Sequence, residues 1–208
     1  MRGIFKPILV GGALALVLAT QLRAQTACSE VDDRDINSPD GRSVLAVHTA
    51  AEGTPTDGDL DIWLSTRGNQ HHLKQVESLA TVAALTDAVW APDSQRFAVT
   101  VSDAGAVGMW HTYVYRLKGA KARGFTDVEP LLKARLRHFS HCDGGPEIND
   151  YAAAWLHHGR QLAVIAEVAP HSVCRDMGDE RGFVVDVRTW RVVRVVPETK
   201  IPTSWCCQ

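Results

Sequence analysis

The residues best suited to chemistry are histidines and cysteines in the C-terminal half of the chain. His138, His141 and Cys142 form a His-x-x-His-Cys segment, and His171 and Cys174 follow at His-x-x-Cys spacing. Zinc prefers imidazole and thiolate ligands, so this spacing is compatible with a zinc site. The favoured interpretation is a disulfide between the two cysteines, because cysteines of an exported chain are usually oxidised. A disulfide removes the thiolates that a metal needs. We therefore assign no metal and no other cofactor, and keep the three histidines only as alternative ligands.

A second set of candidate groups is acidic. Glu147, Asp150 and Glu167 lie close to the third of three similar segments described below, and two carboxylates about 5–10 Å apart can hydrolyse a glycosidic bond. The chain has 24 acidic residues, however, and such sets arise easily by chance. It also lacks the Gly-x-Ser-x-Gly and His-Glu-x-x-His motifs of hydrolases. A small exported hydrolase or metal-binding protein, using these carboxylates or the histidines, is therefore the alternative to a non-enzymatic function.

The N-terminus predicts export. Arg2 and Lys6 give a basic start, and residues 8–18 form an apolar, uncharged run that is shorter than the roughly 20 residues of a membrane-spanning helix. Ala24 supplies the small residue that signal peptidase needs before the cut. We predict a signal peptide over residues 1–24 and a single β-rich, propeller-like domain over 25–208, located in the periplasm or secreted. An uncleaved anchor and lipidation of Cys28 remain as alternatives.

All the cysteines follow the predicted signal peptide. They are Cys28, Cys142, Cys174, Cys206 and Cys207. An oxidising compartment favours disulfides, and an odd number leaves at least one thiol over or paired with another chain. Two pairings are natural: Cys142 with Cys174, and Cys28 with one of the two C-terminal cysteines. The connectivity stays open at this point, because sequence alone does not determine it.

Charge excludes one class of partner. The full chain carries a formal charge of −2, and removal of the basic signal peptide makes the mature chain more acidic. Nucleic-acid binding depends on the neutralisation of phosphates by basic residues, so we expect no nucleic-acid partner. No apolar run beyond the signal peptide is long enough to span a membrane.

Three similar segments organise the rest of the chain. Residues 37–47, 90–99 and 155–164 each combine a turn with an apolar strand. The turn residues are Ser38, Pro39, Asp40, Gly41, Trp90, Pro92, Asp93, Trp155 and Gly159. Proline presets φ, aspartate caps local amides and glycine permits a positive φ, which together make a tight reversal. The β-branched and aromatic residues that follow suit a pleated, buried surface.

Further strands complete each unit. Residues 60–64, 110–117 and 183–187 read as second strands, and 191–196 reads as an outer strand of the third unit. The pattern predicts a mainly β chain, an antiparallel meander repeated three times. One segment departs from it: apolar residues at helical spacing predict a short helix over 127–139, capped by Asp127 and with Pro130 in its first turn. We expect this inserted helix to cover an edge of the sheet.

The turns and strands together resemble a known family. The Ser-Pro-Asp-Gly turn at 38–41 and the Trp-Ala-Pro-Asp-Ser turn at 90–94, each followed by a strand and later by an Ile-Trp or Val-Tyr strand, resemble blades of TolB-type and WD40-like β-propellers. The third unit keeps only Trp155, Gly159 and the strand that follows. The resemblance implies three degenerate blades, whereas propellers close with four to eight. A fourth blade within 118–150, a homodimer that completes a ring, or an open curved array with a covered edge would each resolve this difference.

The resemblance also sets the functional expectation. Propellers are rigid scaffolds whose loops at one rim are a common recognition surface. We therefore expect a non-enzymatic exported binding module that contacts another envelope or secreted protein through its loops. Enzyme activity is left open as the less favoured interpretation.

Overall fold

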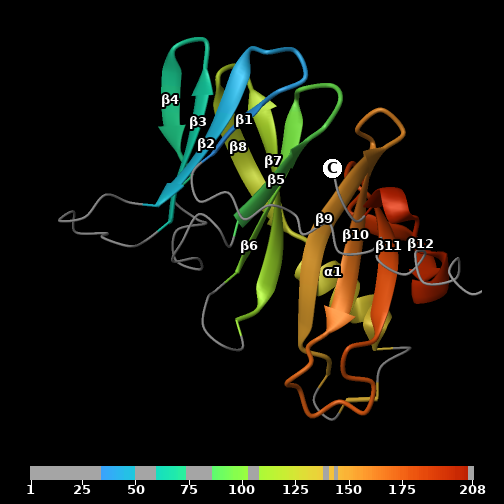
Figure 1. The fold of residues 1–208 in the computed structure, drawn as a ribbon. Coiled ribbons are helices and arrows are strands. Elements are labelled where there is room, and N and C mark those ends of the chain that lie inside the picture. The colour runs from blue at the N-terminus through green and yellow to red at the C-terminus, as the bar shows by residue number, and fades with distance from the viewer. Residues whose placement is uncertain are drawn as a thin grey trace, which may run out of the picture.

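The part of the chain that the structure describes forms three antiparallel sheets, and each has four strands. The computed structural model describes residues 34–49, 60–73, 86–102, 108–137, 141–142 and 145–205, and Figure 1 shows the sheets following one another along the chain. Several predictions fall on residues outside these ranges: the signal peptide, Cys28, Cys206, Cys207, His138 and residues 74–85. The structure confirms the predicted fold class, because the chain is mainly β and forms propeller-like four-stranded units.

Every sheet is a meander in sequence order. The first sheet contains β1 (Arg34–Asn37), β2 (Ser43–Thr49), β3 (Leu60–Thr66) and β4 (Asn69–His72). The second contains β5 (Thr86–Trp90), β6 (Arg96–Ser102), β7 (Trp110–Lys118) and β8 (Lys121–Asp127). The third contains β9 (Ile148–Leu156), β10 (Gln161–Val168), β11 (Glu180–Asp186) and β12 (Arg191–Pro197). The helices are α1 (Glu129–Leu136), η2 (Glu198–Lys200) and η3 (Thr203–Trp205).

The sequence analysis named no strand before each turn and so missed the innermost strands β1, β5 and β9, and it also missed the outer strands β4 and β8. β4 consists of polar residues only, and β8 is largely exposed, so neither shows the apolar pattern by which a strand is recognised. Residues 118–150 accordingly contain β8, α1 and the start of β9, which belong to the second and third sheets. This segment therefore holds no fourth blade among the residues that the structure places.

Two apolar layers join the sheets, because alternate residues of a strand point to opposite faces. Leu45 and Ile62 of the first sheet share a buried cluster with Phe97 and Tyr115 of the second. The rings of Phe97 and Tyr115 stack with their centroids 5.0 Å apart. On the other face of the second sheet, Val114 belongs to the cluster that contains Leu162 and Phe183 of the third. The second sheet thus packs on both faces.

The predicted helix is present as α1. It runs over Glu129–Leu136, shorter than the predicted 127–139, and the prediction that Asp127 caps it is wrong, because the N-cap is Val128 and no side chain caps the helix. Asp127 lies one residue earlier, and its Oδ1 accepts a hydrogen bond from the backbone N–H of Glu129 at 2.9 Å. Leu132 and Leu136 are buried in the cluster between the second and third sheets, and α1 packs against β9 and β12. The helix therefore brings its first residue, Glu129, to the joint between the two sheets.

The C-terminal segment covers the opposite face of the third sheet. Trp205 is only 6% exposed and packs in a cluster with Ala163, Val184 and, at its margin, Ile201. Gly182 lies directly beneath it: a Cβ at this position would stand 2.9 Å from Trp205 Cζ3. Glycine is required there by close packing, and the face of the third sheet that points away from the second is covered by the chain itself.

Equivalent tryptophans connect successive sheets. Trp90 donates its indole N–H to the carbonyl oxygen of Ile36 at 3.0 Å, and Trp155 donates to the carbonyl oxygen of Val89 at 3.0 Å. Each tryptophan lies at the end of the innermost strand of its sheet, β5 or β9. Each donates to the innermost strand of the preceding sheet, β1 or β5. The tryptophans that recur in the sequence therefore make the same kind of contact between successive sheets, which we call the tryptophan joint.

The turns of the three repeats lie in a row. The backbone N–H of Asp40 donates to Ser94 Oγ at 3.1 Å, and Arg96 Nη1 donates to the carbonyl oxygen of Gly159 at 2.9 Å. Gly159 has a φ of +80°, and a Cβ there would lie 3.2 Å from the Cβ of Ala91. The turn residues thus hold neighbouring sheets together at the end of the molecule where these turns lie. Within the ranges given above, no helix has the length and hydropathy needed to cross a membrane.

Candidate functional site

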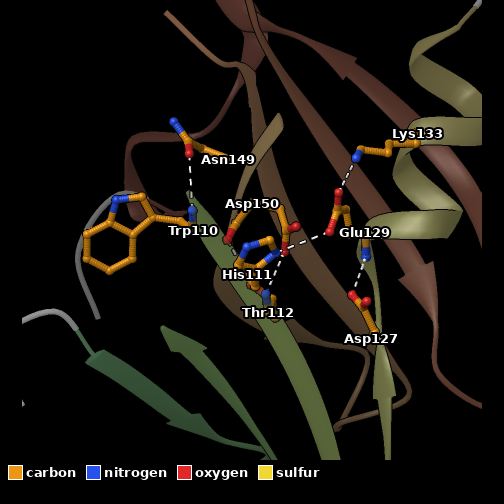
Figure 2. Close-up of polar contacts among 8 residues, drawn as sticks. All are labelled: Trp110, His111, Thr112, Asp127, Glu129, Lys133, Asn149 and Asp150. Carbon is orange, nitrogen blue, oxygen red and sulfur yellow. Dashed lines mark hydrogen bonds and ion pairs between the residues drawn. The ribbon is translucent and has the colours of Figure 1, made fainter. Parts of the chain in front are cut away.

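A cluster of titratable side chains lies where β7, β9 and α1 meet (Figure 2). It consists of His111 from β7, Glu129 from the start of α1 and Asp150 from β9, which we call the junction triad. One potential ligand atom from each of the three residues lies within 4.8 Å of the others. The site therefore spans the second sheet, the inserted helix and the third sheet.

Glu129 is held by two basic partners. Its Oε2 accepts a hydrogen bond from His111 Nδ1 at 3.1 Å, and its other carboxylate oxygen forms an ion pair with Lys133. The hydrogen bond from His111, followed by that from Lys133, lowers the pKa of Glu129 to about 2. Glu129 is therefore an ionised carboxylate with a fixed orientation at neutral pH.

Asp150 is fully buried and only half satisfied. Its Oδ1 accepts a hydrogen bond from the backbone N–H of Thr112 at 2.8 Å, and the Thr112 hydroxyl donates to the backbone carbonyl of Asp150 at 3.0 Å. Its Oδ2 has no hydrogen-bond partner within the described ranges. Burial disfavours the charged form and raises the pKa of Asp150 to about 8, so this carboxyl is mainly neutral at pH 7.

The neighbouring residues of the site serve to position it. Asn149 Oδ1 accepts a hydrogen bond from the backbone N–H of Trp110 at 3.1 Å, and its Nδ2 donates to Glu167 at 3.0 Å. Together with the Thr112 contacts, these bonds fix the inner strand of the third sheet against β7. The arrangement offers one imidazole and two carboxylates on rigid elements, a set that can bind a cation or exchange a proton.

Only one of the carboxylates predicted from the sequence belongs to this cluster. Glu147 is exposed, and the Glu167 carboxylate binds Asn149. The partners of Asp150 are instead His111 and Glu129, which the sequence analysis missed. They lie 39 and 21 positions away along the chain. The signal that the sequence offered was Asp150 itself, an acidic residue in a strand that is largely buried.

The structure confirms the predicted disulfide between Cys142 and Cys174, whose Cα atoms are 4.4 Å apart. Because the two sulfur atoms are bonded to each other, they offer no thiolates to a metal. His141 and His171 are both exposed, and the potential ligand that groups with the two sulfurs is Asp176 instead. The zinc alternative that used these thiolates is therefore wrong.

The disulfide braces two loops at one end of the third sheet. The backbone N–H of His141 donates to the Asp176 carboxylate at 3.1 Å, and the N–H of Arg175 donates to the His141 carbonyl at 3.3 Å. This braced loop, residues 169–179, presents Val173 at 86% exposure and Met177 at 51%. An apolar pair is thus held in solvent by a disulfide and backbone hydrogen bonds.

Replacement of both Cys142 and Cys174 by alanine is expected to lower the free energy of unfolding by about 2–3 kcal/mol, because the unfolded chain loses a cross-link. The two residues are separated by 32 positions. Urea unfolding of both proteins, with and without reductant, measures the effect. The double variant should respond to reductant less than the wild type does, and an unchanged wild-type midpoint in reductant would contradict the prediction.

A small cavity of about 200 Å³ lies between the outer strands of the first and second sheets. His71, Tyr115, Lys121 and Arg123 are among the residues that line it. His71 Nε2 and the Tyr115 hydroxyl are buried there without a hydrogen-bond partner. The residues that line it include no carboxylate and no member of the junction triad, so the two sites are separate although Tyr115 lies on β7, the strand that carries His111.

Comparisons with known proteins give little further information. No family model matches the chain, and no curated protein matches it. Among solved structures, the chain is similar to the acylaminoacyl peptidase of Pyrococcus horikoshii in an orthorhombic crystal form, with 14% identity and a TM-score of 0.44. The match covers 81% of this chain and 25% of that chain, so this chain spans about a quarter of the peptidase. The assignment of a propeller-like architecture rests on the three sheets described above.

Proposed function

We propose that the protein is a non-enzymatic exported binding module that contacts another protein through the braced loop. The observation that carries the proposal is the exposure of Val173 and Met177 on a segment held by the Cys142–Cys174 disulfide. A rigid loop loses little conformational entropy on binding, so exposed apolar side chains on it add to affinity at low cost. The same side chains on an unbraced loop would be weaker anchors.

The chemistry of the loop defines the partner that it fits. The exposed side chains of Val173 and Met177 suit a shallow apolar surface, and the exposed Arg175 between them suits an acidic group at its rim. Methionine adapts its shape to a partner more readily than branched side chains do. We infer a folded protein partner with an apolar patch and a neighbouring carboxylate.

Three features of the sequence support a location outside the cytoplasm for the proposed function. They are the signal-like N-terminus, the cysteine content and the turns that resemble TolB-type and WD40-like blades. A disulfide persists in an oxidising compartment, which supports a periplasmic or secreted location. We therefore propose an envelope or secreted protein as the partner class, with the propeller-like sheets as the scaffold.

Site-specific cross-linking in the exporting host tests the proposal. A photoreactive amino acid at position 173 should give one dominant cross-linked protein, which mass spectrometry identifies. The same probe at Arg188 is the control, because this exposed residue lies in the turn after β11, at the opposite end of the strand from the braced loop. Cross-linking at position 188 should be absent.

The purified partner then allows a quantitative test. Val173→Asp combined with Met177→Asp is expected to weaken its binding about 30-fold or more, the loss typical of central interface residues. Arg188→Glu should leave the affinity unchanged. Equal cross-linking at both positions, or an affinity insensitive to the double substitution, would refute the proposed surface.

A further inference from the structure

The junction triad has the composition of a metal site. It offers one imidazole from His111 and carboxylates from Glu129 and Asp150, contributed by three elements that are far apart in sequence. Figure 2 shows the three side chains converging from β7, α1 and β9. A divalent cation at this point would link the second sheet, the helix and the third sheet.

The observed distances are close to those of a bound ion. At metal–ligand distances of about 2.1 Å, two ligands of a tetrahedral ion are about 3.4 Å apart. His111 Nδ1 and Glu129 Oε2 lie 3.1 Å apart, so this pair already has ligand spacing. An ion would replace the proton that the two atoms share. The remaining ligand atom, from Asp150, lies within 4.8 Å of the other two, so a small side-chain movement would bring it to ligand spacing.

An independent observation also indicates a ligand at this place. Asp150 is fully buried, and its Oδ2 finds no hydrogen-bond partner among the residues that the structure describes. Buried polar atoms without partners are rare in native proteins, and a bound ion or water is a common explanation. Figure 2 shows the Asp150 carboxyl group next to the His111 ring, on the side of the Glu129 carboxylate. The unpartnered oxygen therefore belongs to a carboxyl group that lies within reach of the other two ligands.

We propose that His111, Glu129 and Asp150 bind a first-row divalent transition-metal cation, with Zn²⁺ as the reference ion. One imidazole with two carboxylates suits Zn²⁺, Co²⁺ or Mn²⁺, whereas Ca²⁺ and Mg²⁺ prefer oxygen ligands alone. The His111 and Glu129 side chains are 17% and 16% exposed. The ion enters from that side, and water completes its coordination.

Lys133 acts as a positioning residue for this site. It pairs with Glu129 Oε1, while Oε2 is the atom that faces His111. Outer hydrogen bonds of this kind orient ligating carboxylates, and their loss commonly weakens metal binding 10–100-fold. The expected role of the ion is structural, because its ligands connect two sheets and a helix.

The test uses the purified mature protein after treatment with EDTA and removal of the chelator. Titration with Zn²⁺ should raise the melting temperature by about 5–10 °C when free metal exceeds Kd about 100-fold. Titration with Co²⁺ should produce visible absorption bands, which report the coordination directly. The stoichiometry should be one ion per chain.

Two variants and a matched control keep the test decisive. Asp150→Asn keeps the acceptor for the Thr112 N–H but removes a carboxylate ligand, and His111→Gln removes the imidazole. Each variant should weaken the binding of Zn²⁺ and Co²⁺ at least 10-fold. His157→Gln combined with His158→Gln removes an adjacent pair of exposed histidines and should leave binding unchanged. Binding that disappears in this control alone, or wild-type protein without a shift and without absorption bands, would overturn the proposal. Neither result affects cross-linking at position 173.

Discussion

Substitution of Asp150 by asparagine is expected to stabilise the metal-free protein at pH 8 by up to about 5 kcal/mol. Burial raises the pKa of Asp150 from 3.8 to about 8. Between these values the unfolded chain carries an ionised carboxylate while the folded chain keeps a neutral one. Each pH unit therefore lowers the free energy of unfolding by up to about 1.4 kcal/mol. The contribution of Asp150 to stability is fully present below pH 3.8 and is lost as pH rises toward 8.

Asparagine resembles the neutral carboxyl in shape and retains the acceptor for the Thr112 N–H, whose hydrogen bond is 2.8 Å long. Urea unfolding of the EDTA-treated proteins at pH 4, 6 and 8 measures the difference. The two curves should nearly coincide at pH 4 and separate steadily above it. Parallel pH profiles for the two proteins would show that Asp150 ionises in the folded state at its ordinary pKa.

Glu129→Gln provides a control of opposite sign. Hydrogen bonds from His111 and Lys133 lower the pKa of Glu129 from 4.5 to about 2. Its contribution to stability is present above pH 4.5 and is lost as pH falls toward 2. This variant should therefore be less stable than wild type at pH 7 and approach it near pH 2, whereas Asp150→Asn departs from wild type at high pH.

Truncation of Trp205 to alanine is expected to lower the free energy of unfolding by about 4 kcal/mol. The side chain is buried against the third sheet, and its removal both exposes apolar surface and leaves a cavity. Urea unfolding at pH 7 measures the loss. Val193→Ala is the matched control, because Val193 is 52% exposed on the same sheet and should change stability by less than about 0.5 kcal/mol.

Gly182→Ala tests the same contact from the other side. Its new Cβ would meet Trp205 Cζ3 at 2.9 Å, so the ring must move and stability should fall. In the Trp205→Ala background, the alanine at position 182 should cost much less, because the clashing ring is gone. Additive losses in the double variant would contradict the close packing of the two residues.

Local signals made much of the fold predictable. The turns at 38–41 and 90–94 contain proline, aspartate and glycine or serine at positions where backbone geometry requires them, and apolar strands follow directly. β12 was predicted because its valines carry the apolar pattern of a strand. β4 and β8 were not, because edge strands of polar residues are stabilised by pairing with a neighbour and not by their own apolar face.

The candidate site was beyond the reach of sequence reasoning. Asp150 was selected as part of a set with Glu147 and Glu167, which are near in sequence but do not share its site. Its actual partners, His111 and Glu129, are brought to it by the packing of the second sheet and α1 on the third. Such contacts depend on tertiary structure, and a single sequence contains no local pattern that reports them.

The tryptophan joints give the array a direction. In both joints the later sheet supplies the indole donor and the earlier sheet supplies the carbonyl acceptor. Asn37 occupies the corresponding position of the first sheet and has no indole to offer. A second copy that stacked its first sheet on the third sheet of another would lack this bond and would also have to displace Trp205. As far as the described residues go, closure of a ring by two copies would therefore depend on contacts other than this hydrogen bond.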